Sequence, residues 1–300
     1  MSANWTAADV PDQSGRVAVI TGSNTGIGYE AAAVLAGKGA HVVLAVRNLD
    51  KGKAAAERIS AATPHAEVTL QQLDLTSLAS IAVAAADLRA AYPRIDLLIN
   101  NAGVMTTPKA TTTDGFELQF GTNHLGHFAL TGRLLALLRK AAAPRVVTVS
   151  STAHRMGVID FDDLQWERKS YSKWRAYGQS KLANLLFTRE LARRVAARGE
   201  PLVSAGAHPG STQTNLQQHS GFSRWAVAIV SQAPPGGALP TLYAATAPGV
   251  KGGDYFGPGR MMELVGPPKP AYSSAASKDA DVAKRLWEVS ERLTQVAYGI

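Results

Sequence analysis

The chain has no cysteine among its 300 residues. Disulfide bonds, thiolate nucleophiles and cysteine-ligated metal sites are therefore excluded. Only 18% of the residues are charged and 46% are hydrophobic, a composition typical of a folded chain. No apolar run reaches the ~18–20 residues that cross a bilayer. Residues 1–14 lack the basic flank and apolar stretch of a signal peptide, so we expect a cytoplasmic protein without a membrane anchor.

The formal net charge of +8 raises the question of a nucleic-acid partner. Nucleic-acid-binding proteins carry basic runs interleaved with aromatic residues. The densest basic groups here, Arg168-Lys169 and Arg193-Arg194 with Arg198, are typical of solvated helix and loop surfaces. We therefore expect no nucleic-acid partner and interpret the charge as a diffuse field that favours anionic ligands.

Short β-branched runs alternate with helical patterns rich in alanine and leucine, which predicts parallel strands joined by helices. The expected strands cover residues 16–21, 41–46, 67–73, 95–99, 145–151, 201–206 and 253–256. Residues 258–270, rich in proline and glycine, are expected to form a loop, and the final helix is expected over 278–296. The chain has no internal repeat or linker, so residues 15–300 are predicted to form one α/β domain after a polar tail, 1–14.

A glycine-rich turn directly follows the first strand. Gly22, Gly26 and Gly28 have the spacing G-x-x-x-G-x-G, which differs from the dinucleotide fingerprint G-x-G-x-x-G. Glycines between a strand and a helix permit a tight turn and let backbone amides approach a pyrophosphate at the helix N-terminus. The position of the turn therefore predicts a dinucleotide site.

Arg47 follows the second strand, where dinucleotide-binding folds select between NAD and NADP. An acidic residue here binds the ribose 2′-hydroxyl of NAD, whereas arginine accommodates the 2′-phosphate of NADP. Arg47 therefore predicts NADP, and an exposed strand-end charge is the alternative. Asp74 follows the third strand and is interpreted either as a contact for the adenine amine or, like Thr76, as a cap of the next helix.

Residues 100–103, Asn-Asn-Ala-Gly, follow the fourth strand. Small and amide-bearing residues suit close approach to a flat ligand, although the same sequence is an ordinary turn signal. Asp114 is predicted to cap a long helix that ends at Arg139 and holds Asn123. Because asparagine is costly inside a helix, Asn123 either has a polar partner or is exposed.

Two histidines, His124 and His127, lie in the same helical stretch. No carboxylate or third imidazole joins them at the spacing of metal ligands. We therefore interpret them as packing or surface histidines and expect no metal site.

Hydroxyl groups follow the fifth and sixth strands. Ser150 and Ser151 end the fifth, where only one of the two faces the site because side chains alternate. A glycine turn at 208–214 follows the sixth. Because the carboxyl ends of parallel strands meet at one edge, we expect a ligand crevice there.

Tyr177 and Lys181 lie four residues apart in a helical stretch and therefore on one face. A phenol with a pKa near ~10 transfers protons poorly at neutral pH unless a cation stabilises its phenolate. Taken alone, the pair is also typical of a solvated helix face with a half-buried ring. Because the pair also lies beside the expected crevice, we predict that the phenol of Tyr177 is a general acid.

Six motifs, in order and spacing, resemble the short-chain dehydrogenase/reductase family. They are Thr21-Gly-x-x-x-Gly-Ile-Gly28, Asn100-Asn-Ala-Gly103, Asn123, Ser151, Tyr177-x-x-x-Lys181 and Pro209-Gly-x-x-x-Thr214. The resemblance implies a single Rossmann-like α/β fold, a doubly wound parallel sheet flanked by helices, that binds NADP(H). The cofactor-binding residues expected from the motifs and the resemblance are Gly22, Ser23, Asn24, Gly26, Ile27, Gly28, Arg47, Asn48, Asp74, Leu75, Asn101, Ala102, Gly103, Tyr177, Lys181, Pro209, Gly210, Thr212 and Thr214.

The resemblance also implies an NADP(H)-dependent oxidoreductase that transfers a hydride between nicotinamide and an alcohol/carbonyl pair. Tyr177 would be the general acid/base, and Lys181 would lower its pKa and bind the nicotinamide ribose. Ser151 is favoured over Ser150 to hold the substrate oxygen, and Asn123 would anchor a water in the proton relay. Two alternatives stay open: a non-catalytic NADP(H)-binding redox sensor or interaction protein, and an enzyme of non-redox or carbon–carbon double-bond chemistry.

Residues 149–154 and 176–187 are similar to the retinol-dehydrogenase and WW-domain-oxidoreductase branch. We expect a small, fairly apolar alcohol, aldehyde or ketone as substrate. Residues 215–235 mix apolar side chains with glycine and proline and are expected to form a substrate lid, with a core or oligomer-facing helix as the alternative. Helices around Asn123 and Tyr177 form a dimer face in many relatives, so a homodimer stays open.

Overall fold

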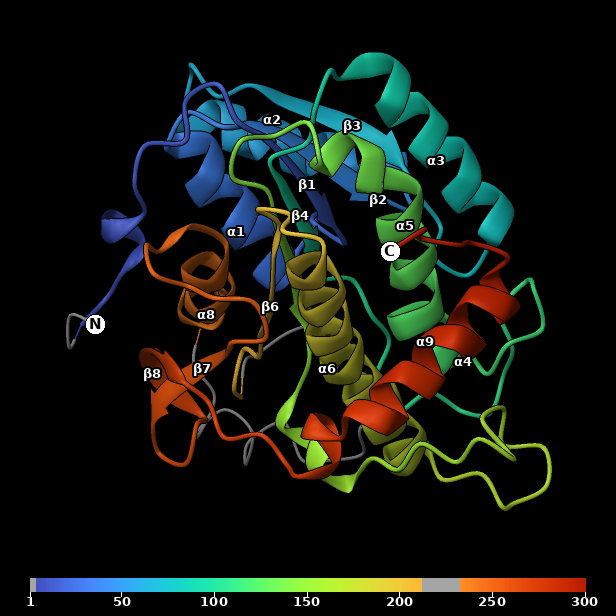
Figure 1. Cartoon of the computed structure of the whole chain (residues 1–300). Helices are drawn as coiled ribbons and strands as arrows, with labels where there is room; N and C mark the ends of the chain where they lie inside the picture. Colours follow the sequence, from blue (N-terminus) through green and yellow to red (C-terminus); the bar gives the residue numbers. More distant parts are fainter. Residues whose placement is uncertain (1–3, 212–232) are drawn as a thin grey trace.

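The computed structural model describes residues 4–211 and 233–300 (Figure 1). Within these ranges, eight strands form one sheet in the order β3-β2-β1-β4-β5-β6-β7-β8. The strands are β1 Val17–Thr21, β2 His41–Val46, β3 Val68–Gln72, β4 Leu97–Asn100, β5 Arg145–Val149, β6 Val203–Ala207, β7 Tyr255–Arg260 and β8 Val265–Pro270. Neighbouring strands are parallel except for the antiparallel pair β7 and β8. The predicted Rossmann-like fold is confirmed.

Helices cover both faces of this sheet. They are α1 Gly26–Gly37, α2 Leu49–Ala62, α3 Leu78–Ala91, α4 Leu118–Phe120, α5 Gly126–Leu138, α6 Lys173–Ala197, α8 Pro234–Thr246 and α9 Ala280–Thr294. Short turns complete the described part: the 3-10 turns η1 Ala7–Asp9, η3 Thr152–Met156 and η5 Ala276–Lys278, and the π-helical turn η2 Gly121–Leu125.

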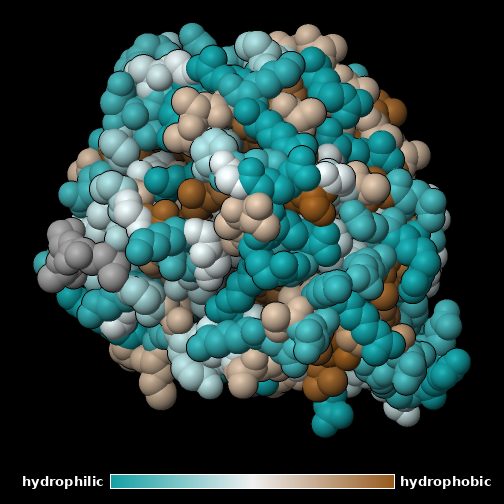
Figure 2. Space-filling model, viewed as in Figure 1, coloured by the Kyte–Doolittle hydropathy of each residue, from teal (hydrophilic) through white to brown (hydrophobic). Residues whose placement is uncertain are grey.

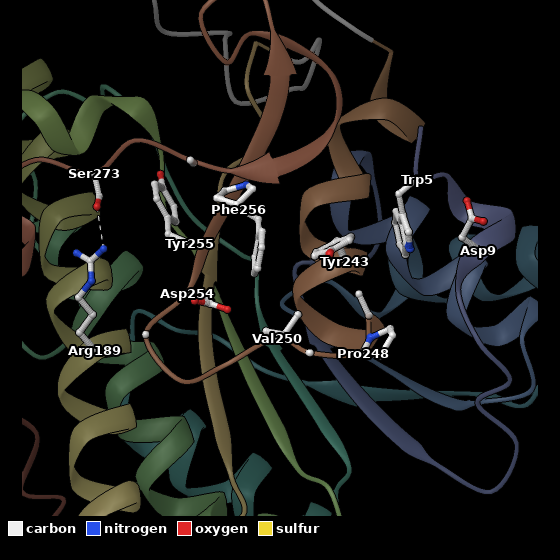
Figure 3. Close-up of a pocket in the computed structure, with 15 residues that line it drawn as sticks. Trp5, Asp9, Arg189, Tyr243, Pro248, Val250, Asp254, Tyr255, Phe256 and Ser273 are labelled. Atoms are coloured by element: carbon white, nitrogen blue, oxygen red, sulfur yellow. Dashed lines mark hydrogen bonds between the residues drawn. The ribbon is translucent and has the colours of Figure 1, made fainter. Parts of the chain in front are cut away.

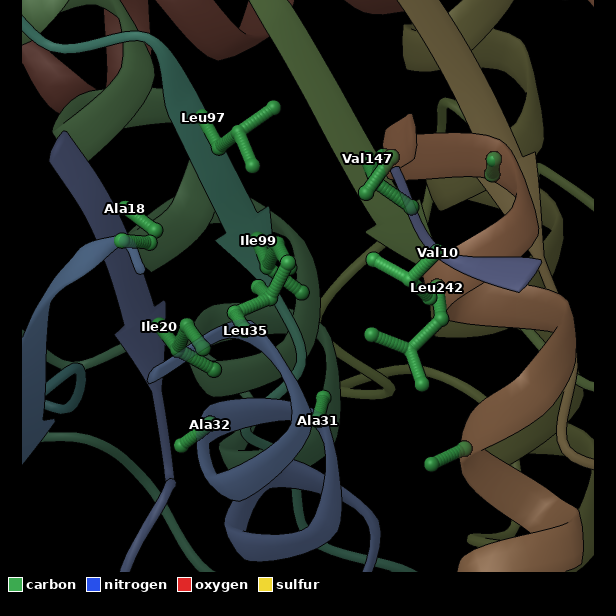
Figure 4. Close-up of a cluster of buried hydrophobic side chains, with 14 of the residues drawn as sticks. Val10, Ala18, Ile20, Ala31, Ala32, Leu35, Leu97, Ile99, Val147 and Leu242 are labelled. Atoms are coloured by element: carbon green, nitrogen blue, oxygen red, sulfur yellow. The ribbon is translucent and has the colours of Figure 1, made fainter. Parts of the chain in front are cut away.

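One apolar layer lies between the sheet and helices α1, α2 and α8. Figure 4 shows Leu35 of α1 and Leu242 of α8 in one buried cluster with the strand residues Ile99 and Val147. Strands buried on both faces are apolar throughout, and this explains why β-branched runs without alternation mark β1, β2, β4 and β5 in the sequence.

A second apolar layer covers the other face, under α3, α5 and α6. Helix α9 packs outside it, where the Trp287 ring stacks on Phe187 with centroids 5.9 Å apart. Leu286 and Val289 of the predicted apolar stripe are buried against α6. The long helix α6 is therefore enclosed on most sides. This packing holds its N-terminal turns in place at the edge of the sheet.

The segment before β1, predicted as a tail, packs against the first of these layers. The Trp5 ring lies edge-on to Tyr243 of α8, with centroids 5.2 Å apart. Val10 belongs to the same buried cluster as α1 and α8. These two side chains anchor a stretch that is otherwise polar.

The prediction of a loop over residues 258–270 was wrong, because these residues form the second half of β7, a turn at 261–264 and all of β8. The two strands pair in register from Phe256 opposite Pro270 to Arg260 opposite Val265, with one irregularity. Proline cannot donate to a sheet ladder, but an edge strand leaves its outer side unpaired. Because β8 is the edge strand, it tolerates the prolines that suggested a loop.

The prediction that Asp114 caps the long helix was also wrong. Its carboxylate accepts a hydrogen bond from the amide of Leu78 at 2.7 Å and so supports the start of α3. Glu117 caps the next helical stretch instead, accepting from the amides of Gln119 and Phe120. Glutamate is not among the usual N-cap residues, and for this reason the sequence did not predict that Glu117 caps this stretch.

The face of the molecule in Figure 2 is mostly hydrophilic, with hydrophobic residues in small, separate patches. Scattered apolar residues of this kind are normal on a protein surface. Among the helices of residues 4–211 and 233–300, none is both long and apolar enough to cross a bilayer.

Candidate active site

A cavity of about 300 Å³ lies where β1, β4, β5 and β6 end at the carboxyl edge of the sheet. Its wall is formed by Gly22, Asn24, Thr25, Gly26, Ile27, Gly28, Asn101, Ala102, Gly103, Val104, Val149, Ser150, Tyr177, Lys181 and Pro209. Most of these are predicted site residues. Thr25, Val104 and Val149 were not predicted, and their adjacency in sequence to predicted residues is the one signal that could have found them.

Glycines bring two backbone turns together on one side of this cavity. Gly22 has φ +66°, and a Cβ at this position would lie 2.8 Å from the Cβ of Ala102. A Cβ on Gly28 would lie 2.5 Å from the side-chain nitrogen of Asn101. The turn leads into the N-terminus of α1, where free amides and the helix dipole favour an anion. The shape and chemistry of this side of the cavity fit a dinucleotide pyrophosphate.

Thr21 holds the neighbouring turn in place from the end of β1. Its hydroxyl oxygen accepts hydrogen bonds from the amides of Asn101 and Ala102, each at 2.9 Å. The same oxygen lies 2.9 Å from His127 Nε2, and His127 Nδ1 lies 2.9 Å from the carbonyl oxygen of Asn123. Burial lowers the pKa of His127 to about 4, so the ring is neutral. A neutral ring that donates from Nδ1 accepts at Nε2, which makes Thr21 the donor there.

His124 also packs in the interior, where burial lowers its pKa to about 3. Its Nε2 lies 2.9 Å from the hydroxyl of Ser290 in α9. Among the residues that the structure describes, no group of three His, Asp or Glu side chains is placed to hold a metal ion. Both histidines are therefore packing residues in this part of the chain.

Asn123 lies in the π-helical turn η2, and both ends of its side-chain amide are occupied. Oδ1 accepts from the amide of Val104 at 2.8 Å. Nδ2 donates to the carbonyl of Val104 and to the hydroxyl of Ser180, each at 2.9 Å. Asn123 therefore has the polar partners that its interior position requires, and it ties the turn after β4 to α6. Local π-helical geometry is frequent at functional sites.

Tyr177 and Lys181 project from one face of α6 into the cavity, and both are buried. The hydroxyl of Ser151 accepts from the amide of Ala153 at 3.1 Å and lies close enough to Tyr177 to influence the pKa of its phenol. Lys181 Nζ donates to the carbonyl of Val149 at 3.0 Å and lies 5.7 Å from the centroid of the Tyr177 ring. The phenol, the hydroxyl and the ammonium thus lie together at the end of β5.

The two adjacent serines have different partners. Ser150 reaches the cavity wall, but its hydroxyl donates to the carbonyl of Lys181 at 2.7 Å. Ser151 is the one whose hydroxyl influences the pKa of the Tyr177 phenol. Ser150 therefore fixes α6 against β5, while Ser151 remains the hydroxyl beside Tyr177.

Burial controls the protonation of both titratable groups. It raises the pKa of Tyr177 to about 12, although the neighbouring Ser151 acts in the opposite direction. It lowers the pKa of Lys181 to about 8. The net shift of the Tyr177 pKa is upward because loss of solvent is the largest effect, and the lowering of this pKa by Lys181 stays a prediction. At neutral pH the phenol is protonated and able to donate, beside a lysine that is mostly charged.

Several predicted residues lie outside this wall. Arg47 is exposed at the end of β2, and its guanidinium has no hydrogen bond or ion pair with the described residues. Asn48 caps α2 by accepting from Lys51 at 2.8 Å. Asp74 accepts from the amide and the hydroxyl of Thr76, at 2.9 and 2.8 Å. The N-cap of α3 is Ser77, so the prediction that Asp74 or Thr76 caps that helix was wrong.

The remaining predicted residues have other surroundings. The hydroxyl of Ser23 donates to the carbonyl of Ile20 and is buried. Leu75 is buried in the apolar layer under α3, and Gly210 follows Pro209 beyond the cavity wall. Thr212, Thr214 and most of the expected lid over 215–235 lie outside the described residues.

A larger hollow of about 680 Å³ lies elsewhere, between the N-terminal segment, α8 and β7 (Figure 3). Its charged side chains already have partners. Arg189 donates to Ser273 and Ser277, and Asp254 accepts from the amide of Lys251. Because these charges are satisfied within the protein, the smaller cavity at the sheet edge is the candidate active site.

Comparison with known proteins agrees with this geometry. A family model described as short chain dehydrogenase matches residues 16–163. Retinol dehydrogenase 11 of Homo sapiens is 42% identical over 281 residues, covering 92% of this chain and 85% of the relative. Retinol dehydrogenase 13 of Homo sapiens is 42% identical over 290 residues, covering 93% and 84%.

A solved structure also superposes over nearly the whole chain. The crystal structure of an uncharacterized protein from Mycobacterium Paratuberculosis has a TM-score of 0.84 and 45% identity, covering 99% of this chain and 100% of that one.

Proposed function

This chain belongs to the short-chain dehydrogenase/reductase family, close to the retinol dehydrogenase branch, and is an oxidoreductase of that family. Within the family, we propose that it transfers a hydride between NADP(H) and an alcohol/carbonyl pair of a fairly apolar small molecule. The observation that carries the proposal is the buried phenol of Tyr177, which lies beside Ser151 and the ammonium of Lys181 in a cavity whose other side is a glycine turn.

The choice of NADP over NAD rests on Arg47. A guanidinium at the end of the second strand is exposed and has no partner among the described residues, so it is free to pair with a 2′-phosphate. The other end of the cofactor would lie along Gly22, Asn101 and Lys181, where amides and an ammonium line the cavity.

A bound nicotinamide would supply the hydride to the carbonyl carbon. Tyr177 donates its phenolic proton to the carbonyl oxygen, since the phenol is protonated at neutral pH. Lys181 stabilises the phenolate that remains, and Ser151 orients the phenol and the substrate oxygen by hydrogen bonding. Oxidation of an alcohol uses the same groups in reverse.

The curated relatives are named as retinol dehydrogenases, which makes a retinol-type alcohol and its aldehyde the first substrates to try. The test mixes the protein with NADPH and a panel of aldehydes, ketones and quinones that includes retinal, and follows nicotinamide absorbance. Turnover of at least one carbonyl supports the proposal. Tight NADPH binding without turnover of any carbonyl would instead support a non-catalytic redox sensor.

A further inference from the structure

The turn that joins β7 to β8 is strained. Its residues Met261, Met262 and Glu263 have φ of 49°, 54° and 67°, in the left-handed region that side chains other than glycine rarely adopt. The side chains of Met261 and Met262 are 59% and 87% exposed, so their burial does not offset the strain. Consecutive residues in this region persist only when surrounding contacts hold them, and such strain is concentrated at functional sites. Within this turn, Glu263 is the residue whose side chain is held by hydrogen bonds.

The carboxylate of Glu263 accepts hydrogen bonds from two groups and lies near a third. Oε2 accepts from Arg155 Nη2 at 2.6 Å, and Oε1 accepts from the amide of Tyr272 at 2.5 Å. Oε2 also lies 3.5 Å from Nε2 of His208. Arg155 stacks on the Tyr272 ring, 4.8 Å from its centroid, so the guanidinium is fixed from a second side. Burial raises the pKa of Glu263, but His208, the Tyr272 amide and Arg155 together lower it below its usual value, so the carboxylate is ionised.

The position of the proton on the His208 ring follows from the contact of its second nitrogen, Nδ1. Its Nδ1 accepts from the amide of Gly210 at 3.2 Å. A neutral ring that accepts at Nδ1 carries its proton on Nε2, the nitrogen that faces Glu263. The ring is 1% exposed, and Nε2 makes no hydrogen bond with the described residues. The Glu263 carboxylate, 3.5 Å away, is the charged group that lies beside this buried nitrogen.

The groups that Glu263 joins lead to two sides of the candidate active site. Arg155 belongs to η3, whose N-cap is Ser151, the hydroxyl beside Tyr177. His208 immediately precedes Pro209 on the cavity wall. The loop touches the strained turn a second time, because the amide of Ser211 donates to the carbonyl of Leu264 at 3.0 Å.

Gly210 makes this second contact possible. It has φ +68°, and a Cβ there would run into the carbonyl of Leu264. The backbone of the loop and the backbone of the turn therefore lie in direct contact.

We propose that Glu263 is a positioning residue for the active site, which holds η3 with Ser151 and the loop 208–211 with Pro209 in fixed relation through Arg155 and His208. The inference rests on the proposed function only in assigning Ser151 to substrate and Pro209 to cofactor. The carboxylate touches neither, and it acts through its two partners. The strained conformation of the turn brings this carboxylate to the point where both Arg155 and His208 can reach it.

The test measures NADPH affinity by fluorescence titration, independently of turnover, and then kcat and KM for the best carbonyl substrate. Glu263→Gln keeps the size of the side chain but removes the charge that Arg155 and His208 share. We expect NADPH binding to weaken on the order of tenfold, with a further fall in kcat/KM. Arg155→Met, on a half-exposed side chain, should give the same loss, and the double variant should lose little more than either single one because the residues act as a unit.

Glu288→Gln is the matched control, since it removes an equivalent charge from the exposed face of α9. Met262→Gln is a second control, in the same turn but without contact to His208. Both should retain wild-type NADPH affinity. The inference is overturned if Glu263→Gln lowers the melting temperature alone and leaves affinity, KM and kcat unchanged, or if Arg155→Met and Glu263→Gln have fully additive effects. If the wild-type protein binds NADPH and reduces no carbonyl, the proposed function fails while the affinity measurements still decide the role of Glu263.

Discussion

Ser151 and Tyr177 lie together at the end of β5, where two effects act on the phenol. Burial raises the pKa of Tyr177 to about 12, and the hydroxyl of Ser151, which accepts from the amide of Ala153 at 3.1 Å, acts in the opposite direction. The phenol is therefore a proton donor over the physiological range. In the proposed mechanism its conjugate base forms only during proton transfer, when Ser151 and the neighbouring ammonium can stabilise it.

Replacement of Arg47 tests the cofactor assignment. Arg47→Asp should shift the ratio of kcat/KM for NADPH over NADH towards NADH by about ten- to a hundredfold, because a charge-assisted contact with the 2′-phosphate becomes a repulsion. Lys284→Asp changes net charge equally on the exposed face of α9 and should leave the ratio unchanged. An unaltered ratio in Arg47→Asp would mean that Arg47 is an ordinary strand-end charge.

The pH profile of carbonyl reduction should follow Lys181 rather than Tyr177. Burial lowers the pKa of Lys181 to about 8, so its ammonium is present below that pH and is lost above it. We expect kcat/KM for reduction to be level near neutral pH and to fall above about pH 8 with the loss of one proton. Lys181→Met should be slow and should lack this alkaline limb. A level profile up to pH 10 in the wild-type protein would contradict this role of the ammonium.

The same lysine should reduce the stability of the fold. Its pKa is about 8 in the folded protein against 10.5 ordinarily, so the unfolded chain binds more protons between these values and stability rises with pH there. Lys181→Met should raise the free energy of unfolding at pH 7 by roughly 1–3 kcal/mol, since it removes a buried charge and Val149 keeps Asn184 as a donor. Denaturant titration should show this gain shrinking by pH 10. A loss of stability at pH 7 would refute it.

Asn123 is expected to matter for stability as well as for turnover. Asn123→Ala removes three buried hydrogen bonds to Val104 and Ser180 and should cost about 2–4 kcal/mol of unfolding free energy. Asn184→Ala removes a single bond to Val149 and should cost roughly 1 kcal/mol. Equal losses in the two variants, measured by chemical denaturation, would show that the Val104 contacts contribute nothing.

The parts of the fold that the sequence predicts are those where local pattern and burial agree. Strands such as β4, apolar on both faces, and the spacing of Tyr177 and Lys181 required no tertiary information. The hairpin of β7 and β8 could not be predicted, because its prolines are tolerated only at a sheet edge and its turn depends on Glu263 meeting Arg155 from far away in the chain. The raised pKa of Tyr177 was missed for the same reason, since burial comes from the packed protein and not from the spacing of two residues.

The most direct test of the account compares Tyr177→Phe with the wild-type protein in two assays on the same sample. The change removes one oxygen from a buried ring and leaves the glycine turn and Lys181 in place. The account predicts that kcat for carbonyl reduction falls by about 10²–10⁴-fold while the dissociation constant of NADPH changes by less than about threefold. Retention of wild-type turnover by Tyr177→Phe would contradict it.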